Sequence, residues 1–390
     1  MSTASALTYC LNIHPAETYE DIISTLEGPV LGVKTLVSPD QSFPIGMRVS
    51  GQALEVLSEP QKRAQLKSVL SGLDMKAISM NGFPYGPFHG TPVKEEVYLP
   101  DWRSDIRLDY TTGLIDLMTD ISDEKWMSLS TVPGCFKSNA AGAEESMANR
   151  FIAAAAHAVK AERETGKTVA LAIEPEPCCF LETIDETIRF FETYLYGASA
   201  VRQLSELTGE SVQASEELLR RHLGVCYDVC HAAVEFEDAA KSLGDLQAAG
   251  IPIHKLQLSA ALRVPNVDAS SRKALVKFEE PTYLHQVVSR NSEGLTRYTD
   301  LSEALARKDT ADGEEWRVHF HVPIFLDDLG ELGTTQAYLA EILAQHRQTP
   351  ISPHLEVETY TWGVLPDRMR TSTIEEAVAR ELTWVMDKLA

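Results

Sequence analysis

The sequence predicts an α/β protein, most simply a single (β/α)8 TIM barrel that occupies residues 1–390. Short β-rich runs alternate with longer Ala- and Leu-rich segments from one end of the chain to the other, which is typical of parallel strands joined by helices. A chain of 390 residues with 44% hydrophobic residues suits one large barrel, and no Pro-, Gly- or Ser-rich linker divides it. A doubly wound sheet with an appended domain is the second choice.

Segments with the composition of strands recur along the chain. They are 7–13, 45–50, 77–81, 127–132, 169–174, 224–228, 253–259, 317–324 and 355–361. These nine segments are one more than the barrel needs. We expect either 45–50 or 253–259 to be the accessory or mistaken one.

The helical segments between the strands carry recognisable ends. The segment 144–165 is followed by Gly166, a residue that commonly caps the C-terminus of a helix. The segments 183–186 and 373–376 each read Thr-Ile-Asp/Glu-Glu, a capping box that opens a helix.

The least regular part of the chain is 266–312. We predict a helix there, then a short hairpin around 283–289 and a second helix near 301–308. The sequence therefore predicts an accessory insertion near 260–312, added to the barrel.

The charge of the chain argues against several classes of partner. The 35 Lys and Arg residues against 57 Asp and Glu residues give a formal net charge of −22. Nucleic acids and anionic membranes attract a positive surface, so we expect neither as a partner. The first residues lack a basic region followed by an apolar core, and no apolar run reaches about 18 residues. The six cysteines form no C-x-x-C pair. We therefore expect a cytoplasmic protein with reduced thiols.

Polar residues stand at the ends of the later predicted strands, where the active site of a TIM barrel lies. Side chains of a strand alternate between its two faces, so residues two apart point the same way. The residues concerned are Glu174, Glu176, Asp228, His231, Gln257, His319, His321, Glu356 and Glu358.

Converging carboxylates and imidazoles repel and desolvate one another unless a cation neutralises them. Mixed carboxylate and imidazole ligands suit Mn²⁺, Mg²⁺, Co²⁺ or Zn²⁺. A single Glu or His at a strand end is usually a solvated or core residue, so this prediction rests on the recurrence at successive strands. The sequence therefore predicts a divalent metal site.

Several peptides resemble known families. Glu174-Pro175 and Asp228-x-x-His231 resemble the xylose-isomerase-like TIM barrels, a superfamily of sugar isomerases and epimerases. Longer peptides, spread over nearly the whole chain, are similar to the metabolite traffic protein EboE family. They are Asn12-Ile-His-Pro15, Asn81-Gly-Phe-Pro-Tyr-Gly86, Phe88-His-Gly90, Pro100-Asp-Trp-Arg103, Glu174-Pro-Glu-Pro177, Val225-Cys-Tyr-Asp-Val-Cys-His231, Tyr283-Leu-His-Gln286, Val318-His-Phe-His-Val-Pro323 and Leu355-Glu-Val-Glu-Thr-Tyr-Thr-Trp362.

The resemblance implies a role in a small-molecule pathway and a metal held by Glu, Asp, His and Glu from consecutive strands. Carried over, Glu174 is the first ligand and Asp228 the second. Glu358 is the last ligand, with Glu356 as the less favoured choice. His231 matches a residue that contacts the substrate or a second metal.

The third ligand is where this chain departs from the family pattern. Chain spacing assigns it to Gln257, a weaker and uncharged ligand, whereas composition favours His321 or His319. We favour His321.

The leading hypothesis is metal-assisted isomerisation or epimerisation of a sugar, sugar phosphate or cyclitol. Glu174 and Glu358 would remove and return a proton next to a metal-polarised carbonyl, and His231 is a third catalytic candidate. A phosphate would meet Lys255 or Arg263. The full set of substrate-binding candidates is His14, Asn81, Glu176, Lys255, Arg263 and His319.

Two other classes remain as alternatives. A barrel with a degenerate site would bind or carry a metabolite without catalysis, and Gln257 as third ligand fits this. The nuclease branch of the superfamily uses three zinc ions; its histidines would be His89, His231, His319 and His321, and the net charge opposes it. A homo-oligomer is compatible with such a barrel, although no residue pattern marks an interface.

Overall fold

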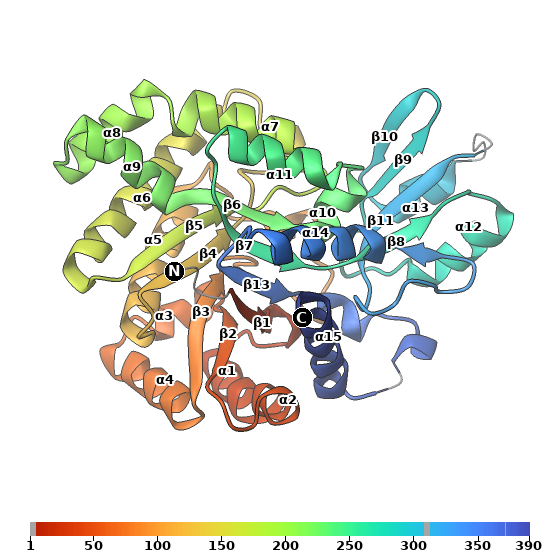
Figure 1. The fold of residues 1–390 in the computed structure, drawn as a ribbon, viewed down its shortest axis with the longest axis horizontal. Helices are drawn as coiled ribbons and strands as arrows, with labels where there is room; N and C mark the ends of the chain where they lie inside the picture. The colour runs from red at the N-terminus through yellow and green to blue at the C-terminus, as the bar shows by residue number, and fades with distance from the viewer. Residues whose placement is uncertain (1–4, 308–312, 371) are drawn as a thin grey trace.

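The computed structural model describes residues 5–307, 313–370 and 372–390, and its main body is a barrel of parallel strands wrapped by helices (Figure 1). The eight strands pair in the order β1-β13-β7-β6-β5-β4-β3-β2, and a parallel bridge between Cys10 and Gly46 joins the two ends. The strands are β1 (Ala6–Tyr9), β2 (Phe43–Arg48), β3 (Met75–Asn81), β4 (Trp126–Thr131), β5 (Thr168–Ile173), β6 (Leu223–Asp228), β7 (Ile253–Leu258) and β13 (His354–Val357). The predicted TIM barrel is confirmed, and the doubly wound sheet is not formed.

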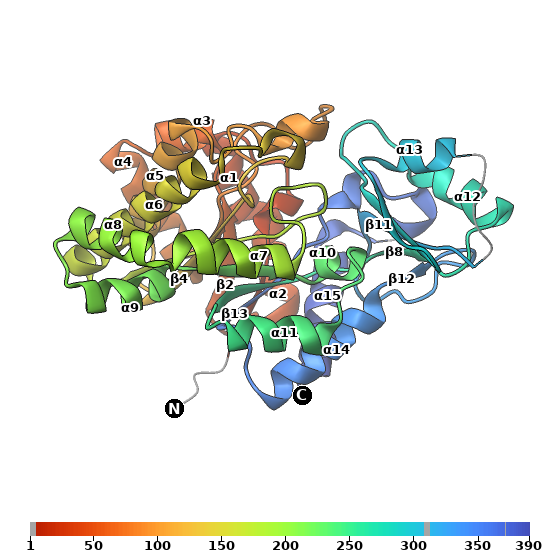
Figure 2. The same ribbon diagram turned by 90° about the horizontal axis from the view of Figure 1, so that it is seen from above.

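Helices follow most of the barrel strands and cover the outside of the sheet (Figure 2). They are α1 (Tyr19–Thr25), α2 (Leu31–Val37), α3 (Gly51–Val56), α4 (Pro60–Gly72), α5 (Asp105–Ile121), α6 (Glu144–Thr165), α7 (Ile184–Phe190), α8 (Ala198–Thr208), α9 (Val212–His222), α10 (Val229–Val234), α11 (Ala239–Ala248), α12 (Ala269–Leu275), α13 (Leu301–Ala306), α14 (Gln336–Gln348) and α15 (Ile374–Leu389). The predicted caps are present. Gly166 ends α6 in the left-handed conformation (φ 68°), and capping boxes open α7 and α15. Among the described residues, no helix is both long and apolar enough to cross a lipid bilayer.

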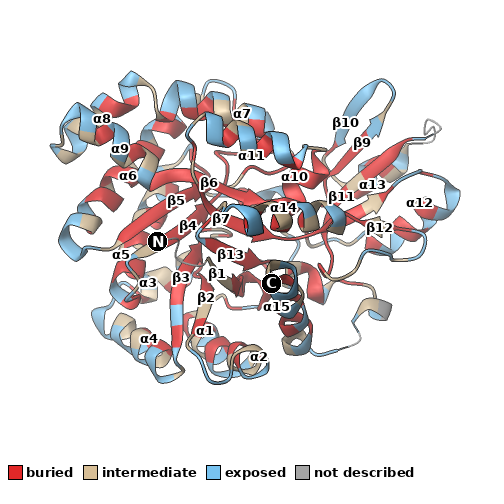
Figure 3. Ribbon diagram, in the orientation of Figure 1, coloured by how far each residue is buried: buried red, intermediate tan, exposed pale blue. Residues whose placement is uncertain are grey.

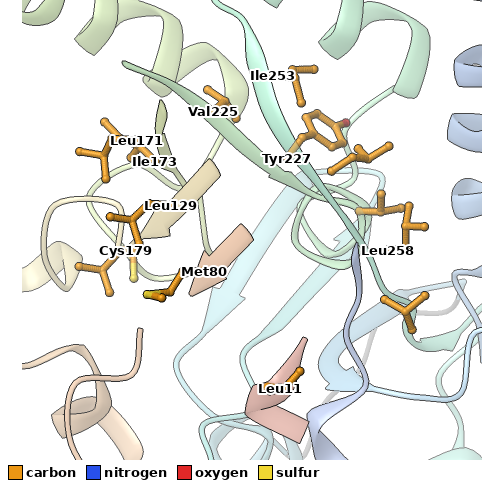
Figure 4. Packing of buried hydrophobic residues seen from close by; sticks show 14 of the residues in the cluster. Leu11, Met80, Leu129, Leu171, Ile173, Cys179, Val225, Tyr227, Ile253 and Leu258 are labelled. Carbon is orange, nitrogen blue, oxygen red and sulfur yellow. The ribbon is translucent and has the colours of Figure 1, made fainter. Parts of the chain in front are cut away.

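Side chains alternate along each strand, so one set points out toward the helices and the other points into the barrel. Outward-facing residues such as Leu129, Leu171 and Val225 gather in one hydrophobic cluster (Figure 4). Inward-facing residues are small or polar, among them Ser130, whose hydroxyl lies 3.3 Å from the Lys255 ammonium. The barrel strands are consequently buried on both faces over most of their length, while exposed residues lie on the outer faces of the helices, in loops and on the hairpin of β9 (Val287–Asn291) and β10 (Gly294–Tyr298) (Figure 3).

The expectation about the surplus strand was wrong. Both 45–50 and 253–259 belong to the barrel, as β2 and β7, and the surplus segment is 317–324. Gly46 of β2 faces the inside of the barrel, next to β13. A Cβ at this position would collide with the Glu356 carboxylate of β13.

The surplus segment belongs to a second, antiparallel sheet inserted between β7 and β13. Its strands pair in the order β10-β9-β11-β8-β12, and it stands beside the barrel (Figures 1 and 2). They are β8 (Ala261–Val264), β9 (Val287–Asn291), β10 (Gly294–Tyr298), β11 (Glu315–His321) and β12 (Gly333–Thr334).

The predicted insertion near 260–312 is therefore larger and extends to β12. The two predicted helices are α12 and α13, although Lys308, the last residue of the second prediction, lies outside the described residues. The predicted hairpin was misplaced along the chain. Its turn lies between β9 and β10, where the Asn291 side chain accepts a hydrogen bond from the Glu293 amide and Gly294 adopts φ 128°.

Candidate functional site

A pocket opens at the carboxyl ends of the barrel strands, where TIM barrels bind their ligands. It is bounded partly by the barrel and partly by loops of the insertion. The lining residues are Asn12, Asn81, Phe83, Phe88, Val93, Val97, Tyr98, Glu174, Glu176, His231, Tyr283, Leu284, His319, Glu358 and Tyr360.

Three carboxylates from different strands meet beside this pocket. Glu174 follows β5, Asp228 ends β6 and Glu358 follows β13, and oxygen atoms of all three lie within 4.8 Å of one another. Parallel strands bring their carboxyl ends to one edge of the barrel, which is why residues so far apart in the chain meet here.

The Asp228 carboxylate is held at one end and free at the other. Its Oδ1 accepts hydrogen bonds from the Ser259 hydroxyl (2.7 Å) and the His231 amide (3.1 Å), and thereby caps α10. Its Oδ2 is buried and has no hydrogen-bond partner. A buried carboxylate oxygen next to two further carboxylates is costly unless a cation neutralises it.

Three imidazoles converge on the same region. His231 lies on α10, and His319 and His321 lie on β11 of the accessory sheet. The Nε2 atom of His319 is 3.2 Å from that of His231 and 3.3 Å from that of His321.

The other nitrogen of each ring fixes its tautomer. Nδ1 of His231 lies 2.9 Å from the carbonyl oxygen of Pro175, and Nδ1 of His321 lies 2.6 Å from that of Glu358. Because a carbonyl oxygen only accepts, each Nδ1 carries the proton and donates. Nδ1 of His319 faces Oε1 of Gln286 at 2.8 Å and donates in the same way.

The three Nε2 atoms therefore turn lone pairs toward one another. A proton on His231 relieves one of these contacts, whereas a metal ion bound by the Nε2 atoms relieves both. The donor set fits such an ion, since it mixes imidazole and carboxylate ligands. Three groups that include these imidazoles have their ligand atoms within 4.8 Å: Asp228 with His231 and His321, Glu176 with His231 and His319, and Cys230 with His319 and His321.

The structure brings His321 beside Asp228, as the sequence-based choice of third ligand requires, but by an unexpected route. His321 belongs to the accessory sheet and not to a barrel strand. Gln257 holds the barrel-strand position that neighbours Asp228 in register. Both polar atoms of its carboxamide are buried without a partner. The residues at both candidate positions thus lie next to Asp228, and the choice between them stays a prediction.

Burial and like charge shift the acid–base properties of the site. Burial, together with the carboxylates of Glu358 and Asp228, raises the pKa of Glu174 well above its usual value. Burial raises the pKa of Glu176 to about 7. Burial and the two neighbouring imidazoles lower the pKa of His319 well below its usual value. The site thus offers carboxyl groups that can exchange protons near neutral pH.

The fold resembles solved structures. A xylose isomerase-like TIM-barrel protein from Mycobacterium smegmatis, solved in complex with magnesium, superposes with a TM-score of 0.52 at 9% identity; the match covers 99% of this chain and 97% of that one. A xylose isomerase domain protein from Planctomyces limnophilus superposes with a TM-score of 0.50 at 10% identity, over 92% and 90% of the two chains. The chain has the xylose isomerase-like fold. L-ribulose 3-epimerase also matches, with a TM-score of 0.47 and 13% identity over 99% of this chain and 95% of that one.

Sequence comparison adds no closer relative. No protein-family model matches the chain, and no curated protein does. The resemblance to the EboE family therefore stays a prediction.

Some predicted substrate-binding residues of this xylose isomerase-like barrel do not reach the pocket wall. Lys255 is fully buried in the barrel floor, where its Nζ lies 2.8 Å from Oε1 of Glu356. Arg263 lies on β8 and pairs with Glu315 at 2.8 Å. His14 is buried against the hydroxyl of Tyr9 at 3.0 Å. Neither Lys255 nor Arg263 is placed to meet a phosphate in the pocket.

The remaining predicted residues are Asn81, Glu176 and His319, and all three line the pocket. Asn81 also belongs to the floor, because its side chain donates to Glu356 and accepts from Lys255. Glu356, the less favoured alternative to Glu358, lies wholly within that floor.

Two residues at the site escaped the reasoning from strand ends. Tyr98, which lines the pocket, donates a hydrogen bond to Glu176 at 2.6 Å, and Gln286 behind it donates to Tyr98 while accepting from His319. Tyr98 ends a short 3-10 helix and Gln286 lies in a loop, so no periodic pattern marks them. Gln286 does fall in a peptide that carries the EboE resemblance, which is the one signal that pointed to it.

Proposed function

We propose that this protein is a metal-dependent isomerase or epimerase of a small polyol, either a sugar or a cyclitol. The observation that carries the proposal is the cluster at the barrel mouth, where the carboxylates of Glu174, Asp228 and Glu358 meet and Asp228 Oδ2 accepts no hydrogen bond although His321 lies beside Asp228. Buried groups of this kind occur together when a cation binds them.

The residues that would hold the metal are Glu174, Asp228, Glu358 and His321, with Gln257 as an additional neutral ligand. When bound, a divalent metal acts as a Lewis acid on a carbonyl and a neighbouring hydroxyl. Mn²⁺, Mg²⁺, Co²⁺ and Zn²⁺ all accept this donor set.

The proton transfer is assigned to the carboxylates. Glu174 removes the proton from the carbon next to the carbonyl, and Glu358 returns one from the other side. The raised pKa of Glu174 makes its carboxylate a stronger base, which supports this role. His231, whose Nδ1 is anchored by the Pro175 carbonyl, orients a substrate hydroxyl. Asn81 and Glu176 complete the polar wall.

The biological setting is part of the proposal. The resemblance to the EboE family supports a place in a small-molecule pathway of the Ebo type, as a metabolite-processing protein. A sugar phosphate is the finer form of the substrate prediction, and the charge of the pocket bears on it below.

A metabolite carrier is the second candidate. The neutral Gln257 beside Asp228 favours it, because an amide binds a metal more weakly than an imidazole or a carboxylate. The nuclease alternative loses support, since both ring nitrogens of His89 are already engaged, by the Asn12 carbonyl and the Tyr283 hydroxyl.

Elemental analysis of protein purified without chelators or a His tag tests the proposal. We expect near-stoichiometric Mn, Mg, Co or Zn in the wild type and none in Asp228→Ala. Asp238→Ala is the matched control, because Asp238 caps α11 as Asp228 caps α10 but lies outside the site. Metal that persists in Asp228→Ala, or is missing from all three proteins, contradicts the proposal and favours the carrier.

A further inference from the structure

The wall of the pocket contains two kinds of side chain. One part of it carries the carboxylates and imidazoles described above. The other part, here called the roof, consists of aromatic and aliphatic side chains. The roof residues are Phe83, Phe88, Val93, Val97, Tyr98, Tyr283, Leu284 and Tyr360. The two parts adjoin, because Tyr98 donates a hydrogen bond to Glu176 and the ring of Tyr360 lies 4.5 Å from that of His321. A ligand in this pocket therefore meets polar and apolar groups side by side.

Part of the roof is a packed aromatic cluster. The ring of Phe88 lies 4.9 Å from that of Tyr283 and 5.3 Å from that of Tyr360, measured between centroids. Phe83 stacks on Tyr98 at 5.7 Å. Phe83 remains half-buried, so part of its apolar surface faces the pocket and lacks a protein neighbour.

The roof is also held in place. It combines loops of the barrel with loops of the insertion, and the Val93 amide donates to the Thr282 carbonyl across this junction at 2.9 Å. The Lys94 ammonium fastens the same junction by bonding to Asp300 and to the Tyr283 carbonyl. An apolar surface that is already ordered binds an apolar group without paying for its own ordering.

No Lys or Arg lines the pocket within the part of the chain that the structure describes. The cations in neighbouring segments are already paired. Lys94 pairs with Asp300 at 2.6 Å, Arg48 with Glu17 at 2.9 Å, and Lys255 with Glu356 at 2.8 Å. A phosphate is recognised by cations and N–H donors, and beside this group of carboxylates it would meet repulsion instead.

We infer that the substrate is an uncharged polyol that carries an apolar substituent. Its hydroxyl groups face the carboxylate and imidazole wall, and its substituent packs on the roof. A phosphorylated substrate is rejected. This inference rests on the proposed function for the class of the polar part, but the roof and the missing cations support it independently.

Isothermal titration of the Mg²⁺-loaded full-length protein with three probes tests the inference. The probes are D-glucose, D-glucose 6-phosphate and phenyl β-D-glucopyranoside. We expect the phenyl glucoside to bind about tenfold more tightly than glucose, because the ring buries apolar surface on the roof. Glucose 6-phosphate should bind more weakly than glucose.

A variant assigns the preference to the roof. Val97→Ala removes apolar surface from it and should reduce the preference for the phenyl glucoside by roughly fourfold, with binding of glucose unchanged. The matched control is Val69→Ala, a half-buried valine of α4 outside the pocket, which should keep the preference.

Tighter binding of glucose 6-phosphate than of glucose overturns the inference. So does a phenyl glucoside that binds no better than glucose, including the case in which neither binds. The titration measures affinity alone, so it can be repeated in Glu174→Gln. If the protein shows no turnover and binds no metal but still prefers the phenyl glucoside over glucose, the inference about the roof stands. In that case only the proposed function is contradicted.

Discussion

Glu356 on β13 and Glu358, the first residue after that strand, belong to two buried clusters that differ in how their charges are neutralised. Glu356 belongs to the floor of the barrel, where its carboxylate accepts from Lys255, Asn81 and Ser79. Glu358 belongs to the mouth, where its neighbours are the carboxylates of Glu174 and Asp228. Both carboxylates are buried, but the floor holds a lysine as counter-charge, whereas the cationic group beside the mouth carboxylates is His231, which is charged only when it is protonated.

The difference teaches how to separate a structural cluster from a functional one. In the floor, Lys255 pairs with Glu356 and also donates to Asn81 at 2.8 Å, so the charges neutralise one another. In the mouth, Asp228 Oδ2 accepts no hydrogen bond and lies 3.9 Å from Nε2 of His231, which is a counter-charge only when it is protonated. A buried charge that is fully paired needs no ligand, whereas an unpaired one indicates that something else binds.

Glu174→Gln tests the mouth with the largest expected effect. We expect turnover to fall by about a thousandfold, because an amide does not accept the substrate proton. Incorporation of deuterium from solvent into a polyol substrate, followed by NMR, measures it. The exposed carboxylate variant Glu20→Gln is the control and should exchange normally. An active Glu174→Gln protein with an intact circular dichroism spectrum would show that the base has been assigned wrongly.

Neutralising one carboxylate in the floor and one in the mouth tests directly whether the two clusters differ. Glu356→Gln leaves the buried Lys255 without its counter-charge and should lower the free energy of unfolding by about 3–5 kcal/mol. Asp228→Asn keeps the Oδ1 cap of α10 and removes a repelling charge, so in the presence of EDTA it should cost little or be stabilising. Urea denaturation measures both variants. If both variants lose the same free energy of unfolding, the charges of the mouth are neutralised within the protein as well as those of the floor are.

The first residue of β13, His354, extends the comparison to a buried imidazole. Burial lowers the pKa of His354 to about 4, and its Nδ1 lies 2.8 Å from the Ser128 hydroxyl. Between pH 6.5 and 4 the unfolded chain binds this proton and the folded protein does not, so stability is lost as the pH falls. Across that window the wild type should lose about 3 kcal/mol relative to His354→Gln. Parallel denaturation curves at each pH for the two proteins would argue that His354 titrates normally.

Stabilisation by added metal is the smallest expected effect. It should depend on Asp228 in the mouth and not on Glu356 in the floor. A ligand at roughly one hundred times its Kd stabilises the folded state by about 2.7 kcal/mol, so Mn²⁺ or Mg²⁺ should raise the Tm of the EDTA-treated wild type. Glu356→Gln should keep this rise, although from a lower starting Tm, and Asp228→Asn should lose it. A rise that survives in Asp228→Asn would place the binding elsewhere. Differential scanning calorimetry measures all three.

Much of the barrel follows from local patterns. The strands of Leu, Ile and Val, the Gly166 cap and the two capping boxes act over a few residues, and such short-range signals are visible in a sequence. The positions of Glu174, Asp228 and Glu358 follow as well, because the ends of parallel strands meet at one edge of a barrel whatever the intervening chain does.

Other features were decided only by the tertiary structure. His321 reaches Asp228 from an antiparallel sheet, and the pairing of β11 with β8 and β9 that places it depends on residues tens of positions away. The sequence predicted Lys255 as a phosphate contact, but in the closed barrel Lys255 is buried against Glu356. The sequence by itself determined which chemical groups the barrel carries, since strand and helix patterns are local. The tertiary structure decided which of those groups neutralise one another and which remain free for a ligand, because that depends on register and on closure of the barrel.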